Sequence, residues 1–356
     1  MTGTVTELDV RALAETDEPA VVELLTTSLG GGPTGNRNAE FFAWKHKRNP
    51  FGISPGLVAV HDGRVVGVRL FMRWRLQAAA EHVSAVRAVD TATHPEFQGR
   101  GIFRRLTLEL LDQLDAAGQV DLVFNTPNTS SRPGYLKMGW QPVGTLPVRL
   151  SPVRPLRFVR GARGAAGSPG PAAPSGHGEV PMPGRRPLPQ CPFPTAATVL
   201  RARSAEVQQL LRETAPSGRL HTPLSLRYLN WRYAEAPDLD YRFLTAESAG
   251  RIVGLAFGRL RRRGPLVEFT VGDLVVRDGD RGTARRLLRA ARRSGADHVA
   301  LHTTPGTEAH RAALVAGYPV LPRGGIALVA NPRRPLAVSP VRPESWRLSL
   351  GDLEVF

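Results

Sequence analysis

The sequence predicts a mixed α/β fold made of two copies of one unit. Segments with alternating apolar residues, typical of strands, take turns with segments whose apolar residues recur every three or four positions, typical of helices. Several residues of the first half recur in the second half at a constant offset of 187, and a Gly-, Pro- and Ala-rich segment separates the halves. Together these observations predict a tandem duplication in which each half forms an α/β unit.

The repeat rests on six identities that align without a gap. They are Trp44/Trp231, Pro50/Pro237, Gly63/Gly250, Arg64/Arg251, Val66/Val253 and Gly67/Gly254. The position after the tryptophan is also basic in both copies, as Lys45 and Arg232. Because both copies keep this pair, we expect it to serve the fold, for example by packing under a hairpin.

The first unit is expected to open with a strand at residues 8–15 and a helix at residues 18–29. Thr16 or Asp17 could cap this helix, and Pro19 suits its first turn. A hairpin is predicted over residues 56–76, because His61-Asp62-Gly63 interrupts two apolar runs.

The rest of the unit continues the alternation of strands and helices. Residues 82–93 read as a strand, and the apolar stripe of Phe103, Leu106, Leu110 and Leu114 predicts a helix. Another strand is predicted at residues 120–126. A short helical or turn segment is expected next, and residues 134–140 follow it.

These patterns divide the chain into three parts. Residues 1–154 form the first unit, residues 155–196 a flexible linker, and residues 197–356 the second unit. The single cysteine, Cys191, lies in the linker, which excludes disulfides and cysteine-ligated metal sites. We expect no metal.

Composition limits the class of partner. The chain has a net charge of +16, and its only lysines are Lys45, Lys47 and Lys137, so the basic residues are nearly all arginine. Aromatic content is 6%, and no platform of aromatic and basic residues stands out, so we attribute the charge to solvated faces and do not expect a nucleic-acid partner. No apolar run approaches the roughly 20 residues that span a bilayer. The N-terminal stretch does not read as a secretory signal, so we expect a cytoplasmic location.

The glycine turn at residues 98–101 carries the clearest chemistry. Gln98, Gly99, Arg100 and Gly101 stand between an apolar strand and a strongly periodic helix that opens with Ile102 and Phe103. The start of a helix carries unpaired N–H groups and partial positive charge, and glycines let a ligand approach the backbone. The turn therefore predicts a cradle for a phosphate or pyrophosphate.

Together with a second landmark, this turn resembles the acyl-CoA signature of the GCN5-related N-acetyltransferases. Gln98 and Gly101 fit the signature, whereas Phe103 replaces its last small residue. The second landmark is an Asn seven residues before a Tyr, followed by Lys, an apolar residue, Gly and an aromatic; it is matched by Asn128, Tyr135, Lys137, Met138, Gly139 and Trp140. The resemblance covers about residues 5–150.

The resemblance implies transfer of an acetyl group from acetyl-CoA to an amine in a ternary complex. Residues 98–103 and Asn128 would bind the cofactor, the edge of the strand at residues 86–93 would pair with the pantetheine arm, and Tyr135 would protonate the departing thiolate. Asp90 is a candidate base, with His94 and Glu96 as weaker candidates. Packing and capping roles stay open for Tyr135 and Asn128, and Pro133-Gly134 departs from the helix that the family has there.

The second unit reads as a degenerate copy. Gly279 stands where the first unit has Gln98, and Ala313 stands at the position of Tyr135. Three alternatives to an acetyltransferase stay open: a transferase that takes aminoacyl groups from tRNA, a non-catalytic acyl-CoA sensor, and a polyanion-binding scaffold. The sequence does not identify the amine acceptor, which could be a small amine, an amino sugar or a peptide.

Overall fold

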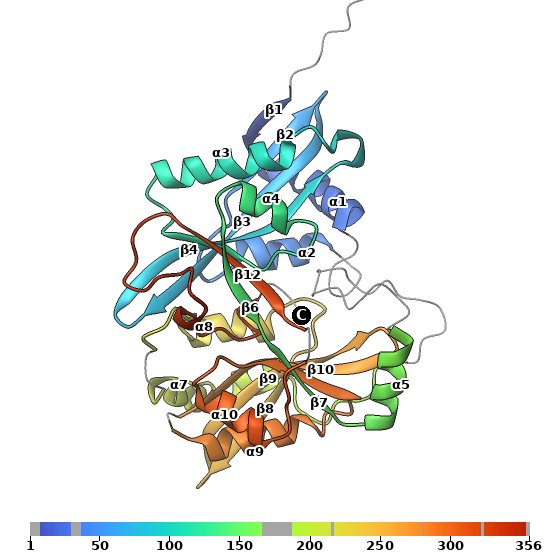
Figure 1. Ribbon diagram of the computed structural model, residues 1–356, viewed down its shortest axis with the longest axis vertical. Coiled ribbons are helices and arrows are strands. Elements are labelled where there is room, and N and C mark those ends of the chain that lie inside the picture. The colour runs from blue at the N-terminus through green and yellow to red at the C-terminus, as the bar shows by residue number, and fades with distance from the viewer. Residues whose placement is uncertain are drawn as a thin grey trace, which may run out of the picture.

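The computed structural model describes residues 8–29, 37–165, 187–214, 217–277, 279–321 and 324–353. Two mixed sheets form its centre, one of seven strands and one of five (Figure 1). We call the larger sheet with helices α1–α4 the first unit, and the smaller sheet with helices α6–α10 the second unit. The mixed α/β fold class predicted from the sequence is confirmed.

The first unit has the strand order β1-β2-β3-β4-β5-β12-β6. Its strands are β1 (Asp9–Ala12), β2 (Gly56–His61), β3 (Arg64–Ala78), β4 (Glu81–Thr93), β5 (Leu122–Asn125), β6 (Gln141–Leu146) and β12 (Ile326–Pro332). All neighbours are antiparallel except β4 and β5, which are parallel.

Helices cover both faces of this sheet. Its helices are α1 (Glu18–Leu29), α2 (Ala39–Phe42), α3 (Ile102–Ala116) and α4 (Arg132–Lys137). The stripe of Leu106, Leu110 and Leu114 on α3 is buried against one face, and α1 packs on the other through Val21, Leu24 and Leu25. The helices expected at 18–29 and after residue 101 are therefore present, while β1 is shorter than the predicted strand at 8–15.

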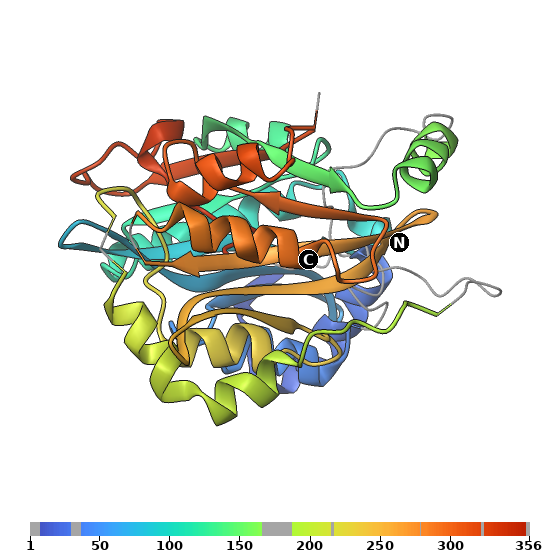
Figure 2. The ribbon, with the colours of Figure 1, turned by 90° about the horizontal axis from the view of Figure 1, so that it is seen from below.

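The second unit repeats this arrangement with the strand order β7-β11-β10-β9-β8. Its strands are β7 (Val148–Pro152), β8 (Arg242–Ser248), β9 (Arg251–Arg263), β10 (Leu266–Val276) and β11 (His298–His302). Its helices are α6 (Ala196–Ala202), α7 (Ser204–Arg212), α8 (Leu226–Leu229), α9 (Arg281–Ala291) and α10 (Glu308–Val315). Figure 2 shows α9 and α10 on one side of the sheet and α6–α8 on the other.

The two units exchange strands. β12 comes from the second half of the chain but pairs with β5 and β6 in the first unit. β7 follows directly after β6 but pairs with β11 in the second unit. Both exchanged strands follow a glycine and an aromatic residue, Gly139-Trp140 before β7 and Gly317-Tyr318 before β12. In each case the strand begins nine positions after the glycine. Each unit therefore depends on a strand supplied by the other.

A pair of tryptophans holds the units together at the centre of the repeat. The Trp44 and Trp231 rings stack with centroids 5.2 Å apart. Trp44 Nε1 donates to the Trp231 carbonyl at 2.7 Å, and Trp231 Nε1 donates to the Trp44 carbonyl at 2.9 Å. Each tryptophan lies in a five-residue π-helix, at Ala43–Lys47 and Asn230–Ala234. The expected structural role of this repeated pair thus takes the form of a contact across the two copies.

The segment expected to be a flexible linker begins with a helix. Its first eleven residues form α5 (Pro155–Ala165). Phe158 of α5 packs edge-on against His298, and Arg154 and Arg157 lie near the carboxylate of Asp297. Most of the remaining linker, residues 166–186, lies outside the described residues. Among the helices described, none is long and apolar enough to cross a membrane.

We expect Trp231→Ala to lower the free energy of unfolding by about 3–5 kcal/mol, the usual cost of removing a large buried aromatic. Because the exchanged strands tie the units together, the loss should affect both. Urea unfolding followed by circular dichroism should still show one transition. A variant in which one unit melts well before the other would contradict this coupling.

Candidate functional site

A cavity of about 800 Å³ opens in the first unit beside the glycine turn. The end of β4, the start of α3, the loop after β5 and helix α4 line it, together with α1 and α2. Of the predicted site residues, Asp90, Gln98, Gly99, Gly101, Ile102, Phe103, Asn128 and Tyr135 all line this cavity. Arg100 does not; its guanidinium lies over the Phe97 ring and donates to the Glu96 carbonyl.

The glycine turn leaves the start of α3 uncapped. Gly99 and Gly101 both have φ of +76°, a conformation that side chains rarely adopt, and no side chain caps the helix at Gly101. The first N–H groups of a helix have no partner within the helix. The amides that follow Gly101 are therefore available to an anion in the cavity.

The strand beside the turn offers a second set of backbone groups. Only Ala85, Val86 and Arg87 of β4 pair with β5, so residues 88–93 leave their edge open toward the cavity. The pairing of β4 with β3 shifts register at Asp90, which bulges out with φ of +39°. An open edge beside a bulge can accept an extended ligand as an additional strand.

Tyr135 reaches the cavity from α4, and its surroundings explain two departures from the family pattern. The Phe103 ring packs edge-on against the Tyr135 ring, with centroids 5.5 Å apart. A Cβ at Gly134 would come within 3.1 Å of the same Phe103 ring. The bulky residue in the glycine turn and the glycine in α4 are thus complementary, and α4 forms despite Pro133, which lies in its first turn.

Arg69 is a site residue that the sequence reasoning missed. Its side chain is fully buried, and Nη1 donates to the Tyr135 hydroxyl at 3.0 Å. Nε and Nη2 have no hydrogen-bond partner, and among the described residues no carboxylate pairs with the guanidinium. The ring of Phe71 lies 4.5 Å away and the ring of Tyr135 5.5 Å away, which partly compensates the buried charge.

Asp90 is enclosed by basic groups. Lys45 Nζ lies 2.5 Å from its carboxylate and Arg37 Nη1 lies 2.7 Å away. His46 Nε2 lies 2.8 Å away, while His46 Nδ1 contacts the Ser54 hydroxyl at 2.9 Å. Burial alone would raise the pKa of Asp90, but the charges of Lys45 and Arg37 outweigh it and hold the pKa well below the usual range. A carboxylate held in this way is a weak proton acceptor.

The remaining candidates take structural positions. Asn128 Oδ1 accepts hydrogen bonds from the Ser131 amide and hydroxyl, so it fixes the turn that leads into α4. His94 contacts Arg64 at 2.8 Å, and neither His94 nor Glu96 lines the cavity. Among the described residues, no group of three or more His, Cys, Asp or Glu could hold a metal ion.

The second unit also has a cavity, along β10, but the start of its helix α9 is capped. Gly254 pairs with Val276 as Gly67 pairs with Thr93, which makes Asp273 the counterpart of Asp90 at a second bulge. Asp280 stands at the start of α9, where its carboxylate accepts from the Thr283 amide at 2.8 Å. This carboxylate caps the helix start that is left uncapped in α3, and it would repel a pyrophosphate.

The environment of Asp90 gives a prediction about stability. Asp90→Asn should remove the buried carboxylate that Lys45 and Arg37 both contact, and should cost about 3–5 kcal/mol at pH 7. Because folding depresses the pKa of Asp90, its contribution is present above the unfolded pKa and is lost as pH falls through the folded pKa. The stability difference from the wild type, measured by urea unfolding, should therefore shrink only below about pH 4. A difference that does not change between pH 7 and pH 3 would refute this account.

Comparisons with known proteins agree with this geometry. Residues 9–143 match the model of an acetyltransferase (GNAT) domain. A search of curated proteins found no significant match.

Several solved structures share the fold of nearly the whole chain. A probable N-acyltransferase of unknown function from Enterococcus faecalis has a TM-score of 0.61 at 12% identity, and a GCN5-related N-acetyltransferase from Anabaena variabilis has 0.60 at 12%. In both cases the match covers 92% of this chain and 73% of the other. Eis1 from Mycobacterium abscessus has a TM-score of 0.51 at 16% identity, with 90% and 73% covered. Residues 9–143, which include the uncapped start of α3 and Tyr135, are thus similar in sequence to an acetyltransferase (GNAT) domain.

Proposed function

We propose that the protein transfers an acetyl group from acetyl-CoA to an amine, in the cavity of the first unit. One observation carries this proposal: the uncapped start of α3, the open edge of β4 and Tyr135 all line one cavity. An anionic, extended thioester needs these three features together. The amides after Gly101 would receive its pyrophosphate, and residues 88–93 its pantetheine arm.

The reaction then needs two proton movements. The amine nitrogen attacks the thioester carbonyl, a C–N bond forms, and the C–S bond breaks. The nitrogen loses one proton, and the departing thiolate takes one from the Tyr135 hydroxyl. The Tyr135 oxygen already accepts a hydrogen bond from Arg69, which leaves its own proton free to be donated into the cavity.

Arg69 would act through Tyr135. When the tyrosine gives up its proton, its oxygen becomes negative, and the fixed guanidinium 3.0 Å away stabilises that charge without moving. Burying an arginine without a carboxylate partner costs free energy of folding. The aromatic rings around Arg69 offset only part of this cost, so its burial supports a role that needs a positive charge beside Tyr135.

Asp90 fits a positioning role better than that of the base. Its ion pairs with Lys45 and Arg37 anchor the bulge of β4 to the segment that carries Trp44. The amine proton then passes to water. The described residues do not define the acceptor beyond an amine that reaches the cavity.

Gly101→Asp tests the cradle by placing an aspartate at the N-cap of α3, the position that Asp280 has in α9. We expect acetyl-CoA affinity to fall at least about 10-fold in calorimetric titration, because the new carboxylate meets the pyrophosphate at the start of α3. Asp tolerates the left-handed backbone better than most residues. The matched control, Asp280→Gly, should leave the affinity unchanged. Wild-type protein that binds no acetyl-CoA at millimolar concentration would rule out the proposed function.

Tyr135→Phe should lower kcat for coenzyme A release with an amine panel by about 100-fold, while acetyl-CoA binds as before. Arg69→Met should lower kcat about 10-fold, and Arg69→Lys should recover part of that loss. In the Tyr135→Phe background, Arg69→Met should add almost nothing, because the two residues act on one proton. Fully additive losses would show that Arg69 acts independently of Tyr135. Acetyl-CoA binding without turnover in the wild type, and no effect of Tyr135→Phe, would favour a sensor.

A further inference from the structure

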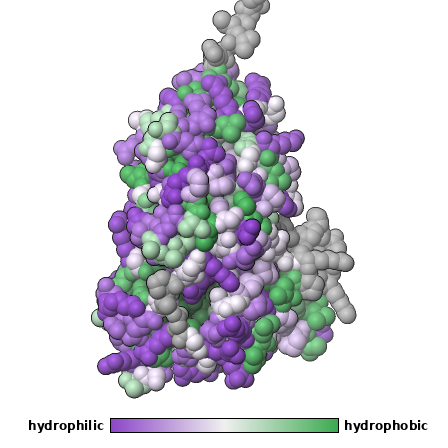
Figure 3. Space-filling model, turned by 60° about the vertical axis from the view of Figure 1, so that its left-hand side comes forward, coloured by the Kyte–Doolittle hydropathy of each residue, from purple (hydrophilic) through white to green (hydrophobic). Residues whose placement is uncertain are grey.

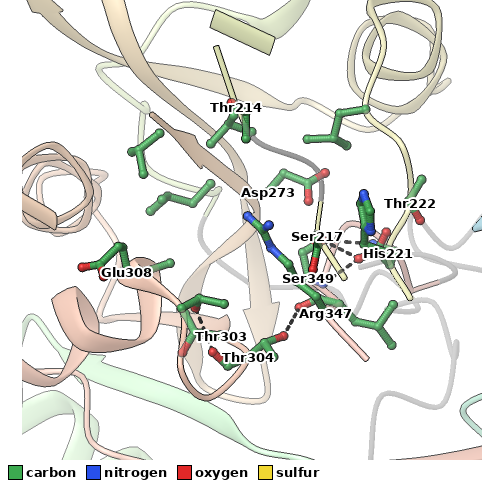
Figure 4. Close-up of a pocket in the computed structure, with 18 of the residues that line it drawn as sticks. Thr214, Ser217, His221, Thr222, Asp273, Thr303, Thr304, Glu308, Arg347 and Ser349 are labelled. Atoms are coloured by element: carbon green, nitrogen blue, oxygen red, sulfur yellow. Dashed lines mark hydrogen bonds between the residues drawn. The ribbon is translucent and has the colours of Figure 1, made fainter. Parts of the chain in front are cut away.

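The second unit contains a cavity of about 520 Å³ that the proposed reaction does not use. It lies at the open edge of β10, since only residues 268–270 of this strand pair with β11. Residues 217–224, the loop after β11 and the segment at residues 347–352 complete its wall (Figure 4). Figure 3 shows a hollow in the lower half of the molecule, where the second unit lies.

Two carboxyl groups lie together in this cavity. Asp273 and Asp352 are each 5% exposed, and both line it. The Tyr233 hydroxyl donates to Asp273 at 2.5 Å, and the Ser349 amide donates to Asp352 at 2.6 Å. Among the described residues, neither carboxyl forms an ion pair. Burial and the neighbouring Asp273 charge raise the pKa of Asp352 to about 6. Burial also raises the pKa of Asp273, against the opposing effect of the buried Arg232 charge.

Two cationic side chains line the same cavity without carboxylate partners. The half-buried Arg347 makes no side-chain hydrogen bond or ion pair with the described residues, and Arg219 donates only to the Pro305 carbonyl, at 2.7 Å. Arg347 stands two positions before Ser349 in a segment whose alternate residues, Trp346, Leu348 and Leu350, are buried. This alternation places Arg347 and Ser349 on the cavity side of one extended segment (Figure 4).

The other charges of the cavity are already paired. Arg277 lies 2.5 Å from Glu213, and Glu308 lies 3.0 Å from Arg281. What remains is two carboxyl groups and two guanidinium groups that line one cavity. The lining is also rich in hydroxyl groups, from Thr222, Thr303, Thr304, Thr307, Ser217 and Ser349.

We propose that this cavity binds a small zwitterion, such as a free amino acid or a dipeptide. Its ammonium group lies against Asp273 and Asp352, and its carboxylate lies against Arg347 and Arg219. Each end of such a ligand can form an ion pair that these groups do not make with the described residues, and the hydroxyl groups satisfy its remaining polar atoms. Acyl-CoA does not fit this role, since the Asp280 carboxylate caps α9 at the equivalent of the cradle.

Calorimetric titration of the full-length protein with the twenty free amino acids and glycylglycine tests the proposal. At least one zwitterion should bind with a Kd below about 10 mM. Ethylamine and acetate, which carry one charge each, should bind at least about 10-fold more weakly than the best zwitterion. Asp352→Asn and Arg347→Gln should each weaken its binding at least about 10-fold. Arg227→Gln, an exposed change outside the cavity, serves as the control and should have no effect.

The same titrations separate this site from the acetyltransferase cavity. Saturating acetyl-CoA and the Gly101→Asp change should leave zwitterion affinity unaltered, whether or not the protein turns over. Arg347→Gln keeps the test valid if Asp352→Asn does not fold. The proposal is overturned if no zwitterion binds, if affinity survives both cavity variants, or if acetyl-CoA displaces the ligand.

Discussion

The stacked pair of Trp44 and Trp231 is the contact on which the rest of the structure depends. Each indole donates to the carbonyl of the other residue, so the two π-helices that carry them are fixed relative to one another. The residues that follow each tryptophan then point at the bulge of their own sheet. Lys45 and His46 hold Asp90, and Tyr233 holds Asp273. The joint between the units and the floor of each cavity are therefore built from the same short segment.

The two cavities occupy corresponding places in the two units, but their charged residues differ. In the first unit the bulge aspartate is neutralised by cations and the helix start is left open. In the second unit the helix start is closed by Asp280, and the bulge aspartate lies near another carboxyl group and forms no ion pair among the described residues. We propose that the first arrangement binds an anion at α3 and that the second binds a cation at Asp273 and Asp352. One fold would then present two chemistries in a single chain.

Local features of the fold could be predicted from the sequence, because each has a local cause. Gly63 and Gly250 recur because both turns need φ of +73°, and Gly67 recurs as Gly254 because a Cβ there would strike Ile102 of α3 or Thr283 of α9. The exchange of β7 and β12 was not predictable in this way, since pairing between distant strands leaves no mark in either segment. Arg69 was missed because it is a single basic residue within an apolar strand, which suggests no function by itself. Only the fold places Tyr135 beside it. Gln98, Gly99 and Gly101 of the glycine turn line the cavity and Arg100 does not, and the roles of these residues stay predictions.

The segment at residues 349–353 shows how closely the two cavities are joined. The Gly351 carbonyl accepts from Arg232 at 3.1 Å, and the Asp352 carbonyl accepts from Arg87 of β4 at 2.6 Å. A Cβ at Gly351 would collide with Tyr233 and Asp273, so the segment fits between the units only because this residue is glycine. Asp352 then lines the cavity of the second unit, while the next residue, Leu353, lines that of the first. One tightly bonded turn therefore forms part of the wall of both cavities.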